Sequence, residues 1–596
     1  MLHGLSLTKR WVVAGLLAWL TFGEPPMAWP QSSSPALPPA TAPSNANAPS
    51  SAAAQPPGTP NVSPAPTIIQ ESADSDGQGK EPESPWARSM PPSAAGRAGW
   101  FRLPPTGEGY YTFLDLLRGK TSDEGPPKVY HPGPSSYELD FSFLDKPGAE
   151  PVDFFDRLKR IPLWSSDSPW QHNLELSIGG EERYEFRNEV GGPAGRLNGI
   201  DDTANLVRTR VWGDLWFRDN IRIFAEFLDS EASYSNGVPP LSTDITRAQF
   251  LSLFADVKLG TFLDSPVYGR IGREEMNYGS TRLLASPDWT NIRRSYDGAK
   301  IFWHTEQLDI DGFWVRPILN LVDRFNTSDH TRQLAGLWTV YRPNKEQTLN
   351  LYYLYFDSDL PVRFGAARGG RGGYDNNTFG ARWDGYHPLA DLLPRLGESA
   401  LAGNVMWDFE GAYQFGDWTA RSISAGMSTT GLGYAFMNLP LQPQFWAYFD
   451  YASGTPHRAD SNSTFETFNQ LFPAGHTYFG YLDEVGRSNI HDLNFQLSIY
   501  PAKWITTYLQ YHIFRLDQAG DALYTTEPDL STNRFSPTGR AGTDVGDELD
   551  LLTEFQLGRH SVLFVGYSKM FSGSFINETG VHTSPEMFYM QYYFRW

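Results

Sequence analysis

Charged side chains alternate with apolar ones from Asn173 to Glu226, and their spacing points most directly to chemistry. Successive side chains of a β-strand point to opposite faces, so residues two apart share a face. This rule places a mixed set of charges on one face: Arg183, Arg187, Arg208, Arg210, Arg218, Arg222 and, further along, Arg270, with Glu175, Glu181, Glu185, Asp214 and Glu226. An arginine fork binds a carboxylate through two parallel hydrogen bonds and keeps its charge at all ordinary pH values.

Two interpretations of these arginines stay open. In the first, they form ion pairs with neighbouring carboxylates and stiffen a wall of strands. In the second, a surplus of arginines forms an electropositive constriction that binds an anionic solute. The first is the simpler explanation for any single arginine, whereas the clustering of Arg208, Arg210 and Arg222 favours the second.

The strands that would position these residues follow from two-residue alternation that continues to the end of the chain. Counting such runs predicts about eighteen strands of roughly ten residues, the length that a tilted strand needs to cross a bilayer. The last run, Glu586 to Trp596, has an apolar face that consists of Phe588, Met590, Tyr592, Phe594 and Trp596. Such a strand suits closure against the first strand, because a closed barrel has no open edge. We therefore predict an all-β, transmembrane antiparallel β-barrel.

The connections between these runs alternate in length, as they do in outer-membrane barrels. Short turns are predicted at 219–220, 306–307, 343–347, 501–503 and 558–560, and long loops at 191–203, 233–246, 277–291, 454–486 and 517–546. Tyr386–Ala402 is long where a short turn is expected, and Gly416-Asp417 is short where a long loop is expected, so the register there is open. The soluble alternative is a β-sandwich or a propeller, but a propeller needs a repeat of 40–50 residues that the sequence lacks.

Composition restricts the class of protein further. The net charge is −20, which argues against a nucleic-acid partner because phosphate-binding surfaces are usually basic. Aromatic residues make up 14% and charged residues 19% of the chain, and no apolar run after residue 22 reaches the length of a spanning helix. The chain has no cysteine, so disulfides, thiol catalysis and cysteine-based zinc sites are excluded.

Four regions are predicted along the chain. Residues 1–28 read as a signal peptide, because Lys9 and Arg10 precede a short apolar run. Residues 29–98 are rich in Pro, Ala and Ser and are predicted to be a disordered linker. Residues 99–170 form an irregular periplasmic or plug segment, with short helices expected near 111–118 and 153–160. Residues 171–596 form the barrel.

A specific motif lies between Tyr268 and Lys300. The chain resembles the alginate export family of outer-membrane porins over about residues 174–596. The matching positions are Gly272, Arg273, Glu275, Tyr278, Gly279, Arg282, Leu283, Asp288, Trp289, Asn291, Arg294, Asp297 and Gly298, with Met276 in place of the usual leucine. Later stretches at 410–416, 448–454, 471–476 and 514–524 are also similar to the family.

The resemblance implies an eighteen-stranded barrel in the outer membrane, with an arginine-lined pore for an acidic polysaccharide such as alginate. It adds Arg273, Arg282 and Arg294 to the expected pore-lining residues Arg208, Arg210, Arg222 and Arg270, although strict alternation points Arg270 inward and Arg273 outward. Asp288, Trp289 and Asn291 are expected to pin the motif loop. The expected partners are membrane lipid, lipopolysaccharide, the barrel assembly machinery and an anionic oligo- or polysaccharide.

Enzymatic alternatives have little support in the sequence. Neither G-x-S-x-G nor H-E-x-x-H is present, and Asp309 with Asp311 reads more simply as a solvated strand face than as a glycosidase pair. Asp517 and Asp521 do not form a calcium loop, because Ala519 stands where a ligand is needed. We predict no catalytic residue, metal or cofactor. The main alternative to a selective channel is a non-selective, structural or adhesion barrel plugged by Gly99–Trp170.

Overall fold

A computed structural model describes the barrel and parts of the segment before it. The described residues are 107–122, 135–139, 141, 144, 153–164, 173–193, 196–322, 324–359, 373–396, 399, 401–419, 421–456, 464–528 and 530–596. The predicted signal peptide (1–28) and linker (29–98) lie outside these residues. Among the described residues, no helix combines the length and apolar character needed to cross a membrane.

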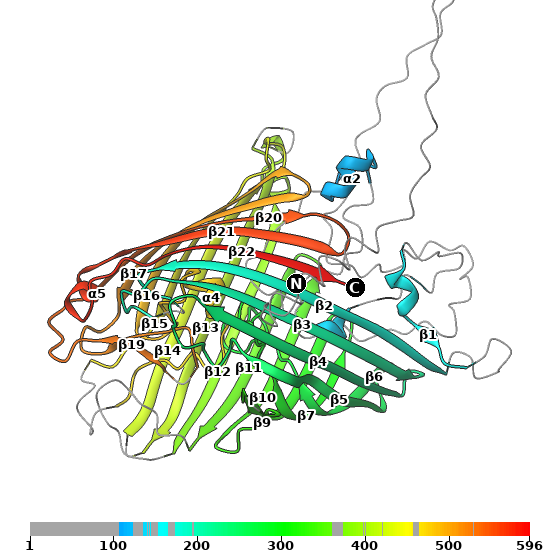
Figure 1. Cartoon of the computed structure of the whole chain (residues 1–596), viewed down its shortest axis with the longest axis horizontal. Helices are drawn as coiled ribbons and strands as arrows, with labels where there is room; N and C mark the ends of the chain where they lie inside the picture. The colour runs from blue at the N-terminus through cyan, green and yellow to red at the C-terminus, as the bar shows by residue number, and fades with distance from the viewer. Residues whose placement is uncertain are drawn as a thin grey trace, which may run out of the picture. The chain divides into compact units, whose positions relative to one another are not determined.

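Eighteen long antiparallel strands form a closed barrel (Figure 1). The wall consists of β2 (Leu174–Val190), β3 (Asp202–Phe217), β4 (Ile221–Tyr234), β5 (Thr246–Phe262), β6 (Ser265–Glu274), β7 (Tyr296–His304), β8 (Leu308–Leu319), β10 (Arg332–Asn344), β11 (Gln347–Ser358), β12 (Tyr374–Pro388), β13 (Gly403–Trp418), β14 (Arg421–Phe436), β15 (Gln444–Ala452), β16 (Ile490–Ala502), β17 (Ile505–Leu516), β20 (Asp544–Gln556), β21 (Ser561–Ser572) and β22 (Glu586–Arg595). Each strand pairs with its neighbour in the chain, and β22 pairs with β2. The predicted fold and strand number are confirmed.

The remaining described elements are short. β1 (Ile161–Pro162) and β9 (Thr327–Ser328) extend the wall at its rims, while β18 (Ala522–Tyr524) and β19 (Thr532–Phe535) pair within a loop. The helical turns are α2 (Phe113–Arg118), η1 (Ser136–Glu138), η3 (Phe155–Leu158), α3 (Leu389–Leu392), η4 (Pro394–Leu396), α4 (Gly475–Tyr478) and α5 (Ser574–Glu578). The two helices expected before the barrel are therefore present, the second as a 3₁₀ turn.

Alternation along each strand separates an apolar outer face from a polar inner face. On β22, Tyr589 and Tyr593 are buried inside, whereas Phe588 and Met590 are each 38% exposed. Ile271 on β6 is 67% exposed and lies between the buried Arg270 and the half-buried Gly272. A bilayer would cover the exposed apolar residues, as expected for the outer face of a transmembrane barrel.

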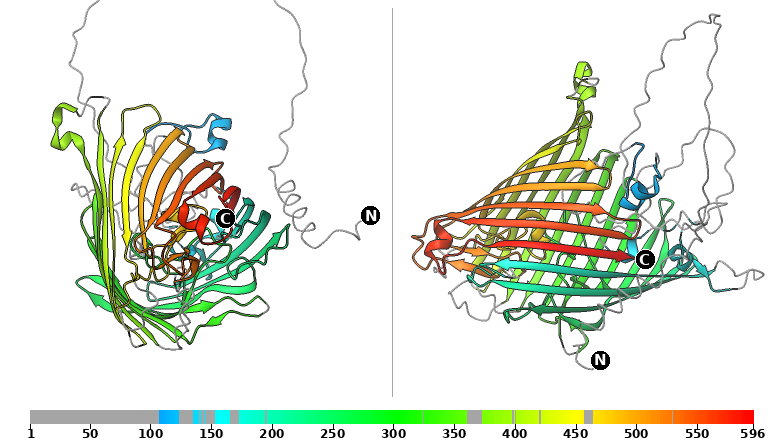
Figure 2. Two further views of the ribbon diagram at one scale, coloured as in Figure 1. Left: turned by 90° about the vertical axis from the view of Figure 1, so that its left-hand side faces the viewer. Right: turned by 45° about the horizontal axis from the view of Figure 1, so that its top comes forward.

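Long and short connections lie at opposite ends of the barrel, and Figure 2 shows the ring of strands in two further orientations. The two exceptions to this alternation that the sequence shows in the middle of the chain are present in the structure. Residues 389–402, with α3 and η4, join β12 to β13 at the short-turn end. β13 and β14 meet in a tight turn at the long-loop end, where Thr419 has a φ of 56° and Trp418 pairs with Arg421. The strand count is unaffected because both departures fall within paired hairpins.

Inward-facing glycines lie directly opposite inward-facing tyrosines on neighbouring strands. The pairs are Gly380 with Tyr352, Gly431 with Tyr448 and Gly566 with Tyr589. A Cβ added at any of these glycines would lie 2.2 Å from the opposite ring. The tyrosine ring therefore covers the space that the missing side chain leaves, a known device for stabilising strand glycines.

The closure between β2 and β22 is covered by the segment that precedes the barrel. Trp596 and Gly180 exchange two backbone hydrogen bonds, of 3.0 and 2.8 Å. Before Gly180 along β2, the pairing partner is β1 instead of β22, and Ile161 pairs with Leu176. The ring of Phe155 on η3 contacts His560, Phe594 and Trp596, with centroids 4.9 to 6.1 Å apart. Residues 153–162 thus seal the seam at the short-turn end.

Candidate functional site

The loop of residues 275–295 between β6 and β7, which we call the motif loop, crosses the inside of the barrel. Tyr278 donates from its hydroxyl to Asp311 of β8 at 2.6 Å. Arg282 reaches β13, where it contacts Asp408 at 2.7 Å and Glu410 at 2.8 Å. At the other end of the loop, Asn291 donates to backbone carbonyls of β3 and β4 and of the β4–β5 loop, at 2.8 to 3.2 Å. The loop is therefore fixed to separate parts of the wall and narrows the lumen.

Asp288 in the motif loop is held by several arginines. Its carboxylate accepts from Arg208 at 2.7 Å and Arg293 at 2.5 Å, and Arg595 lies 3.6 Å away. Arg183 donates to its backbone carbonyl at 2.6 Å. Burial tends to raise the pKa of Asp288, but the surrounding guanidinium groups hold that pKa well below its usual value. The Asp288 side chain is 27% exposed, whereas the side chains of Arg208 and Arg293 are 0% and 1% exposed, so solvent reaches this site at the carboxylate and not at these two guanidinium groups.

Two of the predicted pore-lining arginines lie next to this cluster on the same wall. Arg210 contacts Glu226 at 2.9 Å, Glu275 at 3.5 Å and Glu181 at 3.6 Å. Arg222 forms a fork with Asp214 at 2.8 and 3.0 Å. Both guanidinium groups are buried and matched by carboxylates.

Arg270 and Arg273, three residues apart on β6, face opposite ways. Arg270 points inward and forms a fork with Asp256 at 2.6 and 2.9 Å. Arg273 shares the face of the exposed Ile271 and forms a fork with Asp297 of β7 at 2.8 and 2.9 Å. Alternation thus continues through Arg273 without a bulge. The expectation that Arg273 lines the pore does not fit this position, because its fork lies on the outer face.

Arg294 links two loops rather than projecting from a strand. Its guanidinium donates to the carbonyl of Ala285 at 3.0 Å and to that of Pro473 at 3.3 Å. Trp289, also in the motif loop, stacks on His476 with the ring centroids 3.8 Å apart, and Arg187 covers its ring at 4.2 Å. The motif residues therefore tie the motif loop to the loop of residues 453–489.

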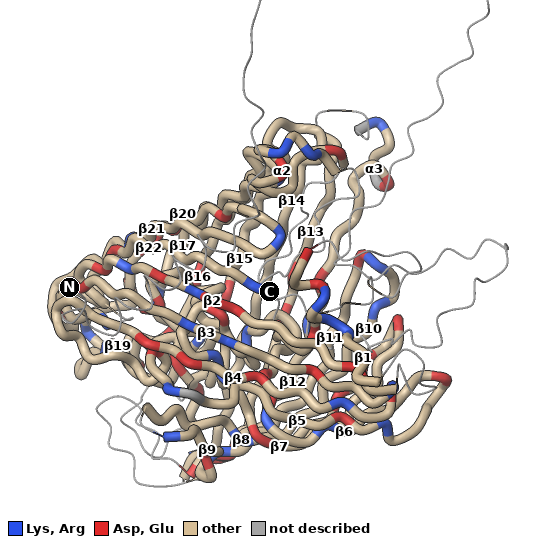
Figure 3. The backbone as a smooth tube through the Cα atoms, turned by 45° about the vertical axis from the view of Figure 1, so that its right-hand side comes forward, with Lys and Arg blue, Asp and Glu red and all other residues tan. Residues whose placement is uncertain are grey.

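The structure places most of the predicted arginines inside the barrel, but on separate parts of its wall. Arg208, Arg210, Arg222 and Arg270 share the wall of β3 to β6, whereas Arg282 is bound to β13 on another part of the barrel. Figure 3 shows basic and acidic positions interspersed along these strands. Each of these five arginines has at least one carboxylate partner, as the ion-pair interpretation requires.

Sequence reasoning overlooked further charged residues of the network. Arg293 and Arg595 bind Asp288, Arg382 binds Asp408, and Arg487 contacts Asp450 at 2.5 Å. Arg595 could have been found, because alternation in the last strand places it inside. Arg293 and Arg487 lie in loops, where no periodicity shows which way a side chain points.

The wall of β15 to β20 carries acidic and amide groups in place of the arginine cluster. His512 contacts Asp492 at 2.7 Å, and Asn494 and Gln510 lie beside them along the inner face. Glu548 and Asp550 of β20 are also buried here. The lumen is therefore uneven in charge, with most of its arginines on one side.

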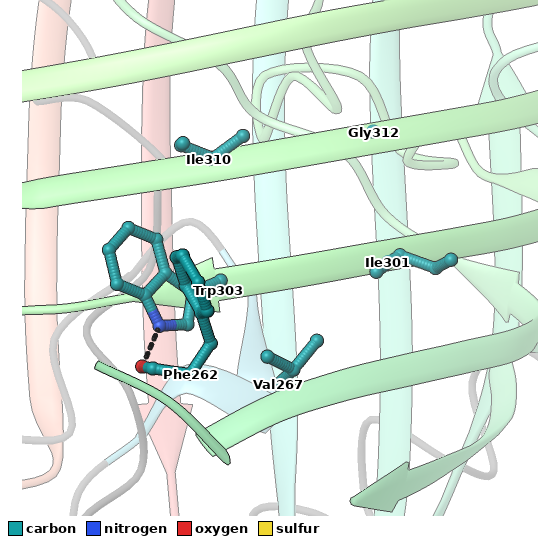
Figure 4. A pocket seen from close by; sticks show the side chains of 6 residues that line it. All are labelled: Phe262, Val267, Ile301, Trp303, Ile310 and Gly312. Atoms are coloured by element: carbon teal, nitrogen blue, oxygen red, sulfur yellow. Dashed lines mark hydrogen bonds between the residues drawn. The ribbon is translucent and has the colours of Figure 1, made fainter. Parts of the chain in front are cut away.

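An apolar groove of about 260 Å³ lies on the outer wall near the short-turn end (Figure 4). Its lining residues are Phe262, Val267, Ile301, Trp303, Ile310 and Gly312. Trp303 donates from its indole nitrogen to the carbonyl of Phe262 at 2.9 Å. Because Ile301 is 57% exposed on this face, the groove belongs to the lipid-facing side and is no part of a solute route.

A closed barrel with an apolar outside and a charged inside is an outer-membrane channel protein. Residues 174–590 match the model of the family described as alginate export, so this chain belongs to that family. The family and the fold place the protein in the outer membrane, in contact with membrane lipid.

Several solved structures are similar to this chain at low sequence identity. Outer membrane protein OprD from Pseudomonas aeruginosa is 11% identical, with a TM-score of 0.46 over 71% of this chain and 93% of that chain. OpdQ and OpdK from the same organism are each 10% identical, with TM-scores of 0.46 and 0.45, over 71% of this chain and 98% of each of those chains. No curated protein matches the sequence.

Proposed function

We propose that this barrel is a passive, anion-preferring channel for an anionic saccharide, such as an alginate-like polyuronate, or for related small anions. The observation that carries the proposal is the set of arginines around the Asp288 carboxylate. Two guanidinium groups bind this carboxylate directly, a third lies 3.6 Å away, and the carboxylate remains partly open to solvent. Each uronate unit also carries one carboxylate, and arginine forks bind that group with good geometry.

The pairing of the arginines fits passage rather than tight capture. A permeating anion must bind strongly enough to enter the lumen and weakly enough to leave it. A wall with several arginines, each partly neutralised by a carboxylate, allows both. Because Arg208, Arg210 and Arg222 already contact carboxylates of the wall, a solute carboxylate would share their donors rather than meet unbalanced positive charge. A chain with many carboxylates could then exchange from one arginine to the next.

The proposal includes no turnover of the solute. The network binds and orients carboxylates, and it needs no cofactor or metal to do so. Lipopolysaccharide around the outer face and the barrel assembly machinery during insertion complete the proposed set of partners.

Ion selectivity in planar bilayers tests the proposal. We expect the reversal potential in a KCl gradient to show anion preference, and Arg208→Ala, Arg210→Ala and Arg222→Ala together to reduce it. Arg218→Ala is the matched control, because Arg218 is exposed at the β3–β4 turn. Unchanged heat-dependent mobility in detergent gels would show that each variant is folded. Cation preference of the unaltered channel would refute the proposal.

One observation favours a second candidate, a structural or adhesion barrel without a through path. Residues of the segment before the barrel contact inner-face side chains of β3, β4 and β6. A protein of this kind would be silent in bilayers whatever its variants.

A further inference from the structure

The segment Ser135–Phe141, which includes η1, makes its described contacts with the inside of the barrel. Tyr137 is 6% exposed and its ring meets Phe224 and Phe254 edge-on, with centroids 5.6 and 5.1 Å away. Its hydroxyl donates to the carbonyl of Glu275, at the start of the motif loop, at 2.5 Å. Tyr137 is therefore seated between the wall and the motif loop.

The same segment contacts three arginines that sequence analysis assigned to the pore. Arg222 donates to the carbonyl of Tyr137 at 2.6 Å, and Arg210 donates to the hydroxyl of Ser136 at 3.1 Å. The guanidinium of Arg270 lies 4.9 Å from the centroid of the Tyr137 ring. The segment thus covers part of the charged surface that a permeating anion would contact.

Both flanks of this segment are attached at the short-turn end of the barrel. On the amino-terminal side, Leu114 of α2 donates its backbone N–H to Leu557 at 3.0 Å, and Phe113 packs on Trp504 at 5.2 Å. On the carboxyl-terminal side, Arg559 contacts Asp153 at 2.7 Å.

Between these attachments, the Phe141 ring stacks on the inward-facing Trp212 of β3, with centroids 6.1 Å apart. The described residues 135–139 and 141 therefore lie against the inner wall, and the described residues on either side of them are attached at one rim.

We propose that Ser135–Phe141 is an internal plug whose docking site consists of Arg210, Arg222, Arg270, Phe224 and Phe254, and that it closes the channel while it is docked. The proposal rests on the channel function proposed above. In the described residues, this segment contacts the barrel through hydrogen bonds with wall side chains, one hydrogen bond to a carbonyl of the motif loop, and ring packing. These described residues form no strand pairing with the wall, so undocking breaks no ladder of backbone hydrogen bonds. An anionic solute competes with the plug, because solute carboxylates accept from the same guanidinium donors that Tyr137 and Ser136 use.

Conductance of the full-length protein in planar bilayers tests this proposal. We expect the unaltered protein to be closed most of the time in KCl, and Tyr137→Ala to raise the mean current severalfold by removing the anchoring ring and hydroxyl. Leu117→Ala is the matched control, because Leu117 lies in the same amino-terminal region and is 66% exposed. Adding a short alginate oligomer to the unaltered protein should increase the fraction of time in the open state.

Cross-linking provides a second measurement, because the chain contains no cysteine of its own. Ser136 and Glu226 are joined by a hydrogen bond of 2.8 Å, so Ser136→Cys with Glu226→Cys can be joined by a disulfide under oxidising conditions. The bridged protein should stay closed even with the oligomer present, whereas each single cysteine variant treated in the same way should not be locked.

The outcomes separate the plug from the selectivity proposal. Equal conductance of the unaltered protein and Tyr137→Ala, or equal silence of both, would overturn the plug. An open Tyr137→Ala channel that prefers cations would leave the plug intact and refute anion selectivity instead.

Discussion

Glu484, in the loop of residues 453–489, gives the most quantitative prediction. Burial raises the pKa of this carboxyl from 4.5 to about 8, and Asp483 and Glu189 add to the rise, which outweighs the opposing hydrogen bond from Asn533. Among the described residues, Oε1 of Glu484 has no hydrogen-bond partner, which suits a carboxyl that keeps its proton. The folded protein therefore holds a proton here that the unfolded chain releases.

The sign and size of the effect follow from linkage. Between the unfolded pKa near 4.5 and the folded pKa near 8, the unfolded chain binds fewer protons, so stability falls as pH rises. At about 1.4 kcal/mol per pKa unit, the loss between about pH 5 and about pH 7.5 is about 3 kcal/mol. Glu484→Gln retains an oxygen that accepts from Asn533 and cannot ionise, so this contribution should disappear.

The assay is the free energy of unfolding of the detergent-solubilised protein, measured against pH by denaturant titration and circular dichroism. Glu484→Gln should lose less stability than the unaltered protein as pH rises, by about 3 kcal/mol over that interval. Glu306→Gln, at an exposed turn, is the matched control and should keep the original slope. If Glu484→Gln and the unaltered protein follow parallel curves, the reasoning about this buried carboxyl is wrong.

Three further predictions concern the barrel. Arg282→Met leaves two buried carboxylates without their shared cation and should cost about 3–5 kcal/mol, seen as a lower midpoint of heat-dependent gel mobility; an unchanged midpoint would contradict this. Gly380→Val forces a side chain into the ring of Tyr352 and should lower stability by about 1–3 kcal/mol, whereas Gly213→Val, with no atom within 4 Å of its added Cβ, should not. Phe155→Ala should increase proteolysis of the segment before the barrel without altering the strand content seen by circular dichroism; equal protection would show that the seam contacts are dispensable.

Two-residue alternation was enough to predict the wall and the faces of the strands at both ends of the barrel sequence, although it left the register open around Tyr386–Ala402 and Gly416-Asp417. It placed Arg270 inside and Arg273 outside, and it assigned both faces of β22 correctly. The reason is physical, because a one-residue error in register would turn every apolar residue of a strand away from lipid. Local sequence therefore carries enough information for the wall.

The partners of the inner arginines could not be predicted in the same way. Arg282 binds Asp408 and Glu410, which lie 126 and 128 residues further along the chain. Such pairs depend on which parts of the wall a loop reaches, and no local pattern records this. The segment before the barrel has the same limitation, since its irregular sequence left a periplasmic position and a lumen position equally open.

The contacts of Phe155 fix an order of events during biogenesis. Its seat is built from His560 in the β20–β21 turn and from Phe594 and Trp596 at the end of the chain. These three groups come together when β21 pairs with β22, and the segment that carries Phe155 also pairs with β2 through Ile161 and Leu176. The segment before the barrel is synthesised first but can make both contacts only on a completed cylinder. Its protection from protease therefore reports that assembly has finished.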